Sequence, residues 1–130
     1  MGRKTGFDAE LFFAALADRT RLRLLNLMRD GEVCVCFFAE ALGTNNPKIS
    51  RHLAYLKRAS LVRARRDGKW MNYSLQRPEN NDGARMFDDL MSMLASDAEM
   101  IADRARLADY CCAPEAPLQI MGRAKKTPAV

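Results

Sequence analysis

The stretch NPKISRHLAYLKRASLVRARRDGKWMNYSL, residues 46–75, decides the fold. In its first part, Asn46 is of a residue type that caps helices, and Pro47 is favoured at the first helical position. These two residues predict the start of a helix that covers residues 47–59. One face of this helix is expected to be buried, because apolar residues recur on it at helical spacing: Ile49, Leu53 and Leu56.

The second part of the stretch predicts a β-hairpin. Residues 61–66 and 69–75 are strand-like runs that mix apolar with basic or polar side chains. The Asp67-Gly68 pair between them is a sequence signal for a type I′ turn. Residues 61–75 are therefore expected to form a hairpin directly after the helix.

Three shorter helices are expected before this stretch. They cover residues 7–16, 19–29 and 33–42, and Asp18 is placed to cap the second of them. The third has no capping residue and two β-branched valines in its first turn, so that turn is expected to be weak. The third helix and the helix over 47–59 form a helix-turn-helix pattern, and the hairpin after them would be its wing.

A single long helix is expected over residues 84–110. Its apolar stripe exceeds what the small core of a 130-residue domain can cover, which predicts dimerisation with a second copy. Residues 1–6 are expected to be a disordered basic arm, and residues 111–130, which begin with a Cys-Cys pair, a flexible tail. The fold class is thus mainly α with a β-hairpin wing (α+β), a winged helix-turn-helix over residues 7–110 that dimerises through terminal helices. The stripe consists of Phe87, Leu90, Leu94, Ile101 and Leu107.

Positive charge is concentrated on the deciding stretch. The chain has a net charge of +5, and between Pro47 and Trp70 eight basic residues accompany one acidic residue. A solvated surface is the ordinary reading of a charge run, but its coincidence with a helix-turn-helix pattern favours a polyanionic partner, double-stranded DNA. An α-helix fits the major groove, where base edges present a readable pattern of donors and acceptors.

Three groups of residues are candidates for DNA contact. The first residues of the recognition helix, 47–59, are expected to reach base edges, the preceding turn to contact phosphate, and the hairpin tip to hold the backbone near the minor groove. His52 is the only histidine, so a histidine-rich zinc site is not expected, and no serine or cysteine triad is recognisable around it. A DNA contact or a packing role is expected of His52 instead. The candidates are Lys48, Ser50, Arg51 and His52 on the helix, Asn45 and Asn46 at the turn, and Arg65, Arg66 and Lys69 at the hairpin tip.

The sequence predicts neither a membrane span nor a secreted protein. It contains no apolar run of about eighteen residues, and its N-terminus lacks the long apolar segment of a secretory signal. We therefore expect a cytoplasmic protein. In a reducing compartment its four cysteines are not expected to form structural disulfides, and the pairs Cys34/Cys36 and Cys111/Cys112 do not match C-x-x-C zinc or redox motifs.

Four motifs in order resemble the ArsR/SmtB family of metal-responsive repressors. The resemblance covers residues 11–75, about half of the chain, and EVCVC is similar to the Cys-x-Cys of the arsenite-responsive members. It implies a winged helix-turn-helix homodimer that binds operator DNA and leaves it when trivalent arsenic or antimony binds its thiolates, with no catalytic cofactor. The motifs are ALADRTRLRLL (15–25), EVCVC (32–36), PKISRHLAYL (47–56) and DGKWMNYSL (67–75).

The resemblance implies that Cys34 and Cys36 bind the metalloid, and thiolates are the ligands that soft ions prefer. Arsenite usually takes three sulfurs, but Ala39 stands where such repressors have a third cysteine, so Cys111 and Cys112 are the remaining candidates. Residues i and i+2 of a helix point about 200° apart. Both sulfurs of the first pair can therefore bind one ion only if the first helical turn is unwound or becomes so. We expect that change to displace the neighbouring recognition helix and weaken DNA binding.

Other readings of the cysteines stay open at this point. Cys34 and Cys36 could be small buried hydrophobes, could form a redox switch with Cys111 or Cys112, or could sense cadmium or lead. A thiol enzyme is disfavoured, because no general base neighbours a cysteine in the sequence and no cofactor motif is present. Zinc sensing through the helix over 84–110 is disfavoured because that helix has no histidine.

Overall fold

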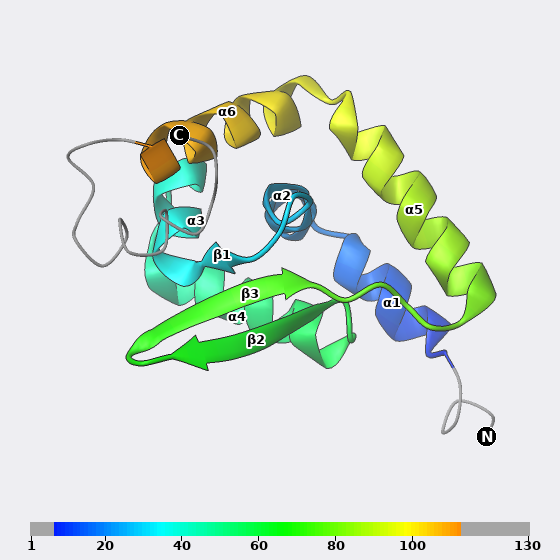
Figure 1. The fold of residues 1–130 in the computed structure, drawn as a ribbon. Helices are drawn as coiled ribbons and strands as arrows, with labels where there is room; N and C mark the ends of the chain where they lie inside the picture. The colour runs from blue at the N-terminus through cyan, green and yellow to red at the C-terminus, as the bar shows by residue number, and fades with distance from the viewer. Residues whose placement is uncertain (1–6, 113–130) are drawn as a thin grey trace.

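Within residues 7–112, the computed structural model contains six helices and one three-stranded sheet (Figure 1). Side chains are described from Phe7 to Tyr110. The predicted arm, residues 1–6, and most of the predicted tail, residues 113–130, lie outside the described residues. The predicted α+β winged helix-turn-helix is confirmed, with α3 and α4 as the helical pair. The elements are α1 (Ala9–Leu16), α2 (Arg19–Leu27), β1 (Val33–Cys34), α3 (Val35–Leu42), α4 (Asn46–Arg58), β2 (Val62–Asp67), β3 (Trp70–Leu75), α5 (Asn81–Ala95) and α6 (Ala98–Cys112).

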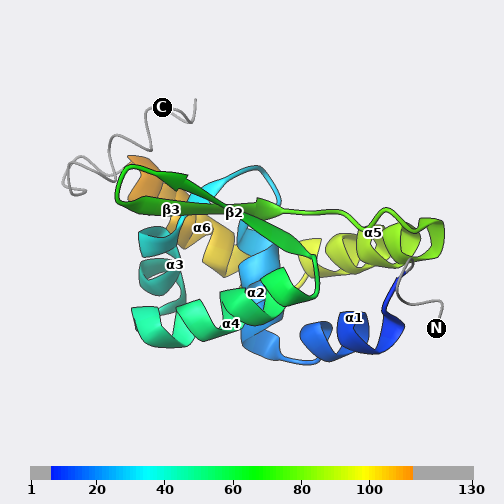
Figure 2. The same ribbon diagram turned by 90° about the horizontal axis from the view of Figure 1, so that it is seen from below.

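The core lies around α2, which the other helices and the sheet surround. Figures 1 and 2 both place α1 and α5 at one end of the molecule and α3 with the end of α6 at the other. The strand order is β1-β3-β2, all antiparallel, so β3 is the central strand. The largest fully buried side chains include Phe12, Leu24, Phe38, Ile49, Leu53, Leu56 and Met100.

Side-chain caps begin five of the six described helices. At α2 the carboxylate of Asp18 accepts a hydrogen bond from the backbone N–H of Arg21 (3.0 Å), which confirms the predicted cap. At α4 the prediction of Asn46 is wrong by one residue. Asn45 has extended backbone angles and its side-chain oxygen accepts from the N–H of Lys48 (2.9 Å), so the helix begins at Asn46 and ends at Arg58.

The helix predicted over residues 33–42 begins two residues late, at Val35. Val33 and Cys34 instead form β1, which pairs with β3. The β-branched side chain of Val33 suits an extended backbone, and α3 has no side-chain cap that would favour an earlier helical start. Cys34 is the last residue before the helix, with φ −71° and ψ 141°.

The hairpin turn lies one residue later than predicted. The wing strands pair up to Asp67 and Trp70, so the two turn residues are Gly68 and Lys69 rather than Asp67 and Gly68. Gly68 has a φ of +64°, whereas Lys69 is not among the described non-glycine residues with positive φ. A type I′ turn needs positive φ at both positions, so this turn is not of that type; glycine at the first position suits type II′.

The single helix predicted over residues 84–110 is wrong, because α5 and α6 are separate helices. Ser96 and Asp97 separate them. The carboxylate of Asp97 accepts hydrogen bonds from the backbone N–H groups of Glu99 (3.0 Å) and Met100 (3.2 Å), which caps the second helix. The break turns α6 back across α2 and along α3 (Figure 1).

Buried polar contacts hold α6 against α2. The carboxylate of Asp103, fully buried, accepts two hydrogen bonds from the guanidinium of Arg23, at 2.7 and 2.9 Å. The amide of Asn26, also buried, donates to the carbonyl of Met100 (3.0 Å) and accepts from Arg104 (2.6 Å). The position of α6 is therefore set by specific polar pairs as well as by apolar packing.

Replacing Ser60 with Gly should stabilise the protein by roughly 0.5–1 kcal/mol. Ser60 ends α4 with a φ of +62°, and the N–H groups of Ser60 and Leu61 donate to the carbonyls of Lys57 and Leu56 (2.9 and 3.0 Å). This is the helix-ending motif in which glycine is normally found, because a side chain strains the left-handed backbone. The midpoint of urea unfolding should rise. An Ala59→Gly control, at a φ of −81°, should lower it, and an unchanged midpoint for Ser60→Gly would contradict the argument.

Candidate functional site

The recognition helix α4 has one buried and one exposed face. Its apolar residues pack into the core, as predicted. Asn45, Asn46, Lys48, Ser50 and Arg51 are all exposed, at the turn and on the first two turns of the helix. These candidates therefore form one continuous surface at the start of α4, which a groove of DNA could accept.

His52 is the exception on this helix, because it is half-buried. Its Nδ1 lies 3.3 Å from Nη1 of Arg21 and 3.8 Å from the carboxylate of Asp18. Burial lowers the pKa of His52, which keeps the ring neutral near pH 7. Arg21 also stacks over Tyr55, at 4.1 Å from the ring centroid. His52 therefore links α4 to α2. This position favours the predicted packing role over the predicted DNA contact.

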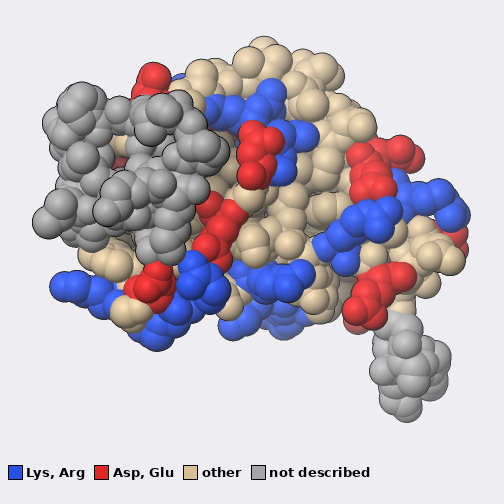
Figure 3. Space-filling model, viewed as in Figure 1, with Lys and Arg blue, Asp and Glu red and all other residues tan. Residues whose placement is uncertain are grey.

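The wing supplies a second exposed basic group. Lys69 is exposed in the hairpin turn, and Arg65 and Arg66 are exposed on the strand that leads into it. Arg65 makes a bidentate ion pair with Glu32, at 2.6 and 2.8 Å, which ties the wing to the segment just before β1. In Figure 3, Lys and Arg side chains gather along the lower edge of the molecule, over the wing and α4. The nine predicted DNA-contact residues thus lie at α4 and on the wing, with His52 half-buried and the other eight exposed.

The first cysteine pair lies where β1 becomes α3. The sulfur atoms of Cys34 and Cys36 are 3.3 Å apart, and the residues are buried and half-buried, respectively. The hydrogen bond with Cys34, together with burial, raises the pKa of Cys36 above that of an ordinary thiol. The predicted condition, that the first turn is unwound or becomes so, is met by its first alternative, because Val33 and Cys34 form β1 and the helix begins at Val35. Only the expected unwinding on binding, and the displacement of the recognition helix derived from it, is not needed. Because Cys34 is already extended, the two sulfurs face each other without any change.

The second cysteine pair ends α6, where Cys111 and Cys112 are helical residues rather than part of a tail. Their side chains are not among those described. The helix that carries them runs along α3: Arg106 donates to the carbonyl of Ala41 (2.8 Å), and the hydroxyl of Tyr110 donates to Glu40 (2.7 Å). Among the described residues, no cluster of three or more His, Cys, Asp or Glu side chains could hold a metal ion.

Sequence reasoning assigned no role to Asn72, which the structure brings next to the first cysteine pair. Asn72 stands directly opposite Cys34 in the β1–β3 pairing. It is 1% exposed, and its Nδ2 has no hydrogen-bond partner among the described residues. The hairpin pattern predicted that residue 72 would lie in a strand, but nothing local signalled that a two-residue strand would pair beside it.

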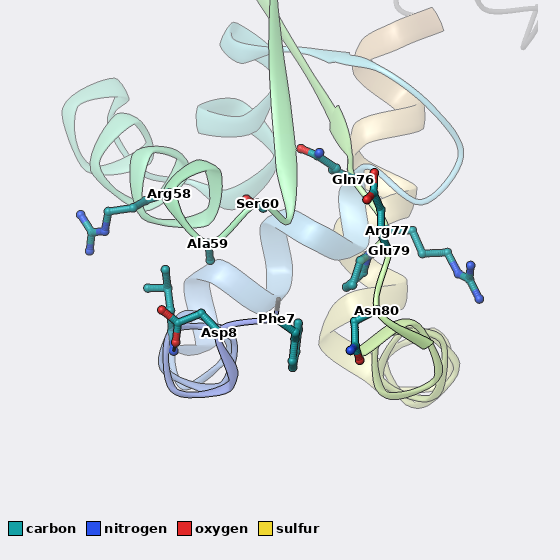
Figure 4. A pocket seen from close by; sticks show the side chains of 11 residues that line it. Phe7, Asp8, Arg58, Ala59, Ser60, Gln76, Arg77, Glu79 and Asn80 are labelled. Carbon is teal, nitrogen blue, oxygen red and sulfur yellow. Dashed lines mark hydrogen bonds between the residues drawn. The ribbon is translucent and has the colours of Figure 1, made fainter. Parts of the chain in front are cut away.

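A pocket of about 590 Å³ lies far from both cysteine pairs, between the start of α1, the end of α4 and the segment that links β3 to α5. Figure 4 shows its two cationic side chains, Arg58 and Arg77, pointing away from its centre. Arg77 is paired with Asp88, and Arg58 lies over Tyr55. Neither cation of the pocket is therefore placed to hold an anion at its centre.

No helix in the described part of the chain is long and apolar enough to cross a membrane.

Comparisons with known proteins agree with this geometry. A family described as "Bacterial regulatory protein, arsR family" matches residues 18–64. The arsenic resistance transcriptional regulator ArsR1 of Pseudomonas putida is 39% identical over 110 residues, which cover 83% of this chain and 84% of that protein. The arsenical resistance operon repressor of Escherichia coli is 48% identical over 64 residues, which cover 48% of this chain and 55% of that protein.

A solved structure is also similar. It is a homodimeric winged helix-turn-helix DNA-binding domain from Mycobacterium bovis, described as a possible ArsR-family transcriptional regulator. The two chains are 33% identical with a TM-score of 0.56, and the match covers 67% of this chain and 78% of that one. Both the sequence and the fold thus lead to the same group of proteins.

Proposed function

The chain belongs to the ArsR family of bacterial regulatory proteins, and on that premise we propose that it is a homodimeric repressor that trivalent arsenic or antimony releases from operator DNA. It is a transcriptional regulator, not an enzyme. The observation that carries the proposal is the sulfur pair of Cys34 and Cys36, 3.3 Å apart at the junction of β1 and α3. That junction touches both DNA-facing elements, since β1 pairs with the wing and α3 packs on α4.

The DNA-binding half of the proposal rests on charge and exposure. Lys48 and Arg51 project from the start of α4, and Arg66 and Lys69 from the wing. In such a domain the helix reads base edges while wing cations hold phosphates, and DNA affinity falls steeply with salt. DNA and reduced thiols are both found in the cytoplasm, which is where we place the protein.

The dimer is supported by apolar side chains that the single chain leaves exposed. Phe13 on α1, Met93 on α5 and Ile101 on α6 are 53%, 61% and 47% exposed. Figures 1 and 2 show α1 and α5 at the end of the molecule opposite α3. A second copy against this end would cover α1 and α5 and leave α4 and the wing free. Two recognition helices about 34 Å apart would then read an inverted repeat.

The metalloid half of the proposal follows from thiol chemistry. Arsenous acid exchanges its hydroxyl groups for sulfurs, each exchange releasing one water from an S–H proton and a hydroxide. Cys34 and Cys36 would supply two sulfurs, and Cys111 or Cys112 the third, from within the subunit or across the dimer. Since the first two are already close together, binding them alone changes little. Recruiting the third would pull the end of α6, which already packs along α3, toward the junction of β1 and α3. A ligand that favours that arrangement shifts the population away from the DNA-binding one.

The DNA interface can be tested with Arg51→Ala. We expect this change to weaken binding by about 1–3 kcal/mol, roughly 5- to 150-fold, because an arginine at the start of a recognition helix contacts bases. The measurement is fluorescence anisotropy with a duplex selected from a random pool by the wild-type protein. Arg77→Ala removes an exposed arginine outside α1 and α5 and should bind like wild type. Equal losses of DNA affinity in the two variants would show that only the net charge of the protein matters. That result would refute the assigned interface.

The metalloid response is tested on the same duplex. Arsenite should lower the affinity of the wild-type protein for it, and that loss should require Cys34 and Cys36. Release of DNA by peroxide but not by arsenite would instead indicate a redox switch. The cysteine variants that make this test specific are treated in the Discussion.

A further inference from the structure

The face of the sheet that carries Cys34 holds a second buried polar group. Asn72 is opposite Cys34 across the β1–β3 pair, and Arg65 is opposite Asn72 across the β3–β2 pair. Residues directly opposite in antiparallel strands point to the same face, with Cβ atoms about 4.5–5.5 Å apart. The side chains of Cys34, Asn72 and Arg65 therefore form one row on one face of the sheet.

The two outer members of this row have polar contacts that the structure records, and the central one does not. Cys34 is hydrogen-bonded with Cys36, and Arg65 with Glu32. Asn72 is 1% exposed, yet its Nδ2 finds no acceptor among the described residues. A buried amide without a partner is costly and therefore uncommon in a native protein. An unpartnered donor beside a candidate ligand pair indicates an acceptor that is present in another state of the site.

A sulfur that has lost its proton to bind an ion is such an acceptor. Its lone pairs and negative charge accept N–H hydrogen bonds more strongly than a neutral thiol does. Groups that hydrogen-bond to ligand atoms orient the ligands and tune the affinity for the ion. The amide of Asn72 is the described side-chain donor placed opposite Cys34 without another partner.

We propose that Asn72 is a positioning residue of the soft-ion site, donating a hydrogen bond from Nδ2 to the ion-bound sulfur of Cys34. The inference rests on the proposed function, since it takes Cys34 as a ligand. The donor is unsatisfied in the ion-free state and satisfied in the bound state, so it favours the bound state. Asn72 also lies on the central strand of the wing sheet, so the same bond links the ion to the wing.

The test compares Asn72→Leu, which keeps the approximate size and removes the donor, with Asn72→His, which restores an N–H. Full-length protein is titrated with arsenite, and binding is followed by the ultraviolet sulfur-to-arsenic charge-transfer band. Asn72→Leu should bind arsenite about 10- to 100-fold more weakly and shift the band to longer wavelength, because a hydrogen bond lowers the energy of the sulfur lone pairs. Asn72→His should recover part of the affinity. Ser74→Ala, a substitution further along β3, should match wild type.

Thermal unfolding without arsenite separates this role from a structural one. Removing an unsatisfied buried donor should leave the Tm of Asn72→Leu equal to or above that of wild type, while its arsenite affinity falls. Wild-type affinity and an unshifted band in Asn72→Leu would overturn the proposal. A lowered Tm in both Asn72 variants with the same loss of affinity would also overturn it, in favour of a purely structural role. If arsenite binding survives in Cys34→Ser and Cys36→Ser, the proposed function itself fails, which is a distinct result.

Discussion

Arg23→Met should lower the free energy of unfolding by about 3 kcal/mol. The carboxylate of Asp103 is fully buried, and Arg23 supplies two of its hydrogen bonds, at 2.7 and 2.9 Å. The methionine fills the space of the arginine stem but leaves the buried charge with Arg106, which is half-exposed. We use the lower end of the usual range for a broken buried pair because Arg106 remains. Urea unfolding at a fixed protein concentration measures the effect.

Two further variants separate burial from charge. Arg23→Met combined with Asp103→Leu should recover most of the stability, because an apolar pair of similar volume replaces the buried ion pair. Arg77→Met breaks a bidentate pair with Asp88 of the same geometry, at 2.7 and 2.9 Å, but on the surface, and should have no measurable effect. Equal losses in Arg23→Met and Arg77→Met would show that burial of Asp103 is not the cause.

Replacing Cys34 or Cys36 with Ser should abolish the arsenite response. In the wild-type protein arsenite should weaken DNA binding by about 5- to 150-fold, the usual range of a coupling between two sites. Either variant should bind DNA like the wild-type protein when arsenite is absent. The ratio of its DNA affinities without and with arsenite should be near one, because serine oxygens are poor ligands for a soft ion. Fluorescence anisotropy with and without arsenite gives the ratio. Full release by arsenite in either variant would remove that sulfur from the site.

The role of the second cysteine pair is tested by the double variant Cys111→Ser, Cys112→Ser. Since the sulfurs of Cys34 and Cys36 are already 3.3 Å apart, we expect this variant to bind arsenite weakly and to remain on DNA at saturation. The single variants then show which of the two cysteines is used. If the double variant leaves DNA at the same arsenite concentrations as the wild-type protein, the third ligand comes from elsewhere.

Local signals made the helix-turn-helix and its wing predictable from the sequence. The apolar spacing of α4, the cap at Asp18 and the glycine in the hairpin each act over a few residues, and each gave the right element. The errors from local signals are shifts of one residue, at the cap of α4 and at the hairpin turn, while the two-residue shift at the start of α3 has a non-local cause. Both adjacent Asn residues before Pro47 are good caps, and only the backbone angles decide between them.

Non-local contacts account for what the sequence did not reveal. The two-residue strand β1 exists because β3, nearly forty residues later, pairs with it. That pairing keeps Cys34 extended and brings the sulfurs together, and it also places Asn72 beside them. The break between α5 and α6 was missed because apolar residues continue through it at helical spacing, while the signal that mattered was a single capping carboxylate at Asp97.

The most direct test of the central claim is an X-ray absorption spectrum at the arsenic edge, recorded on the full-length protein with one equivalent of arsenite per subunit. If Cys34 and Cys36 bind the metalloid together, the wild-type spectrum will show a first shell of sulfur atoms alone. The spectrum of the double variant Cys34→Ser, Cys36→Ser will show oxygen neighbours of arsenic in place of sulfur. A wild-type shell that contains oxygen and does not change in the double variant would contradict the account.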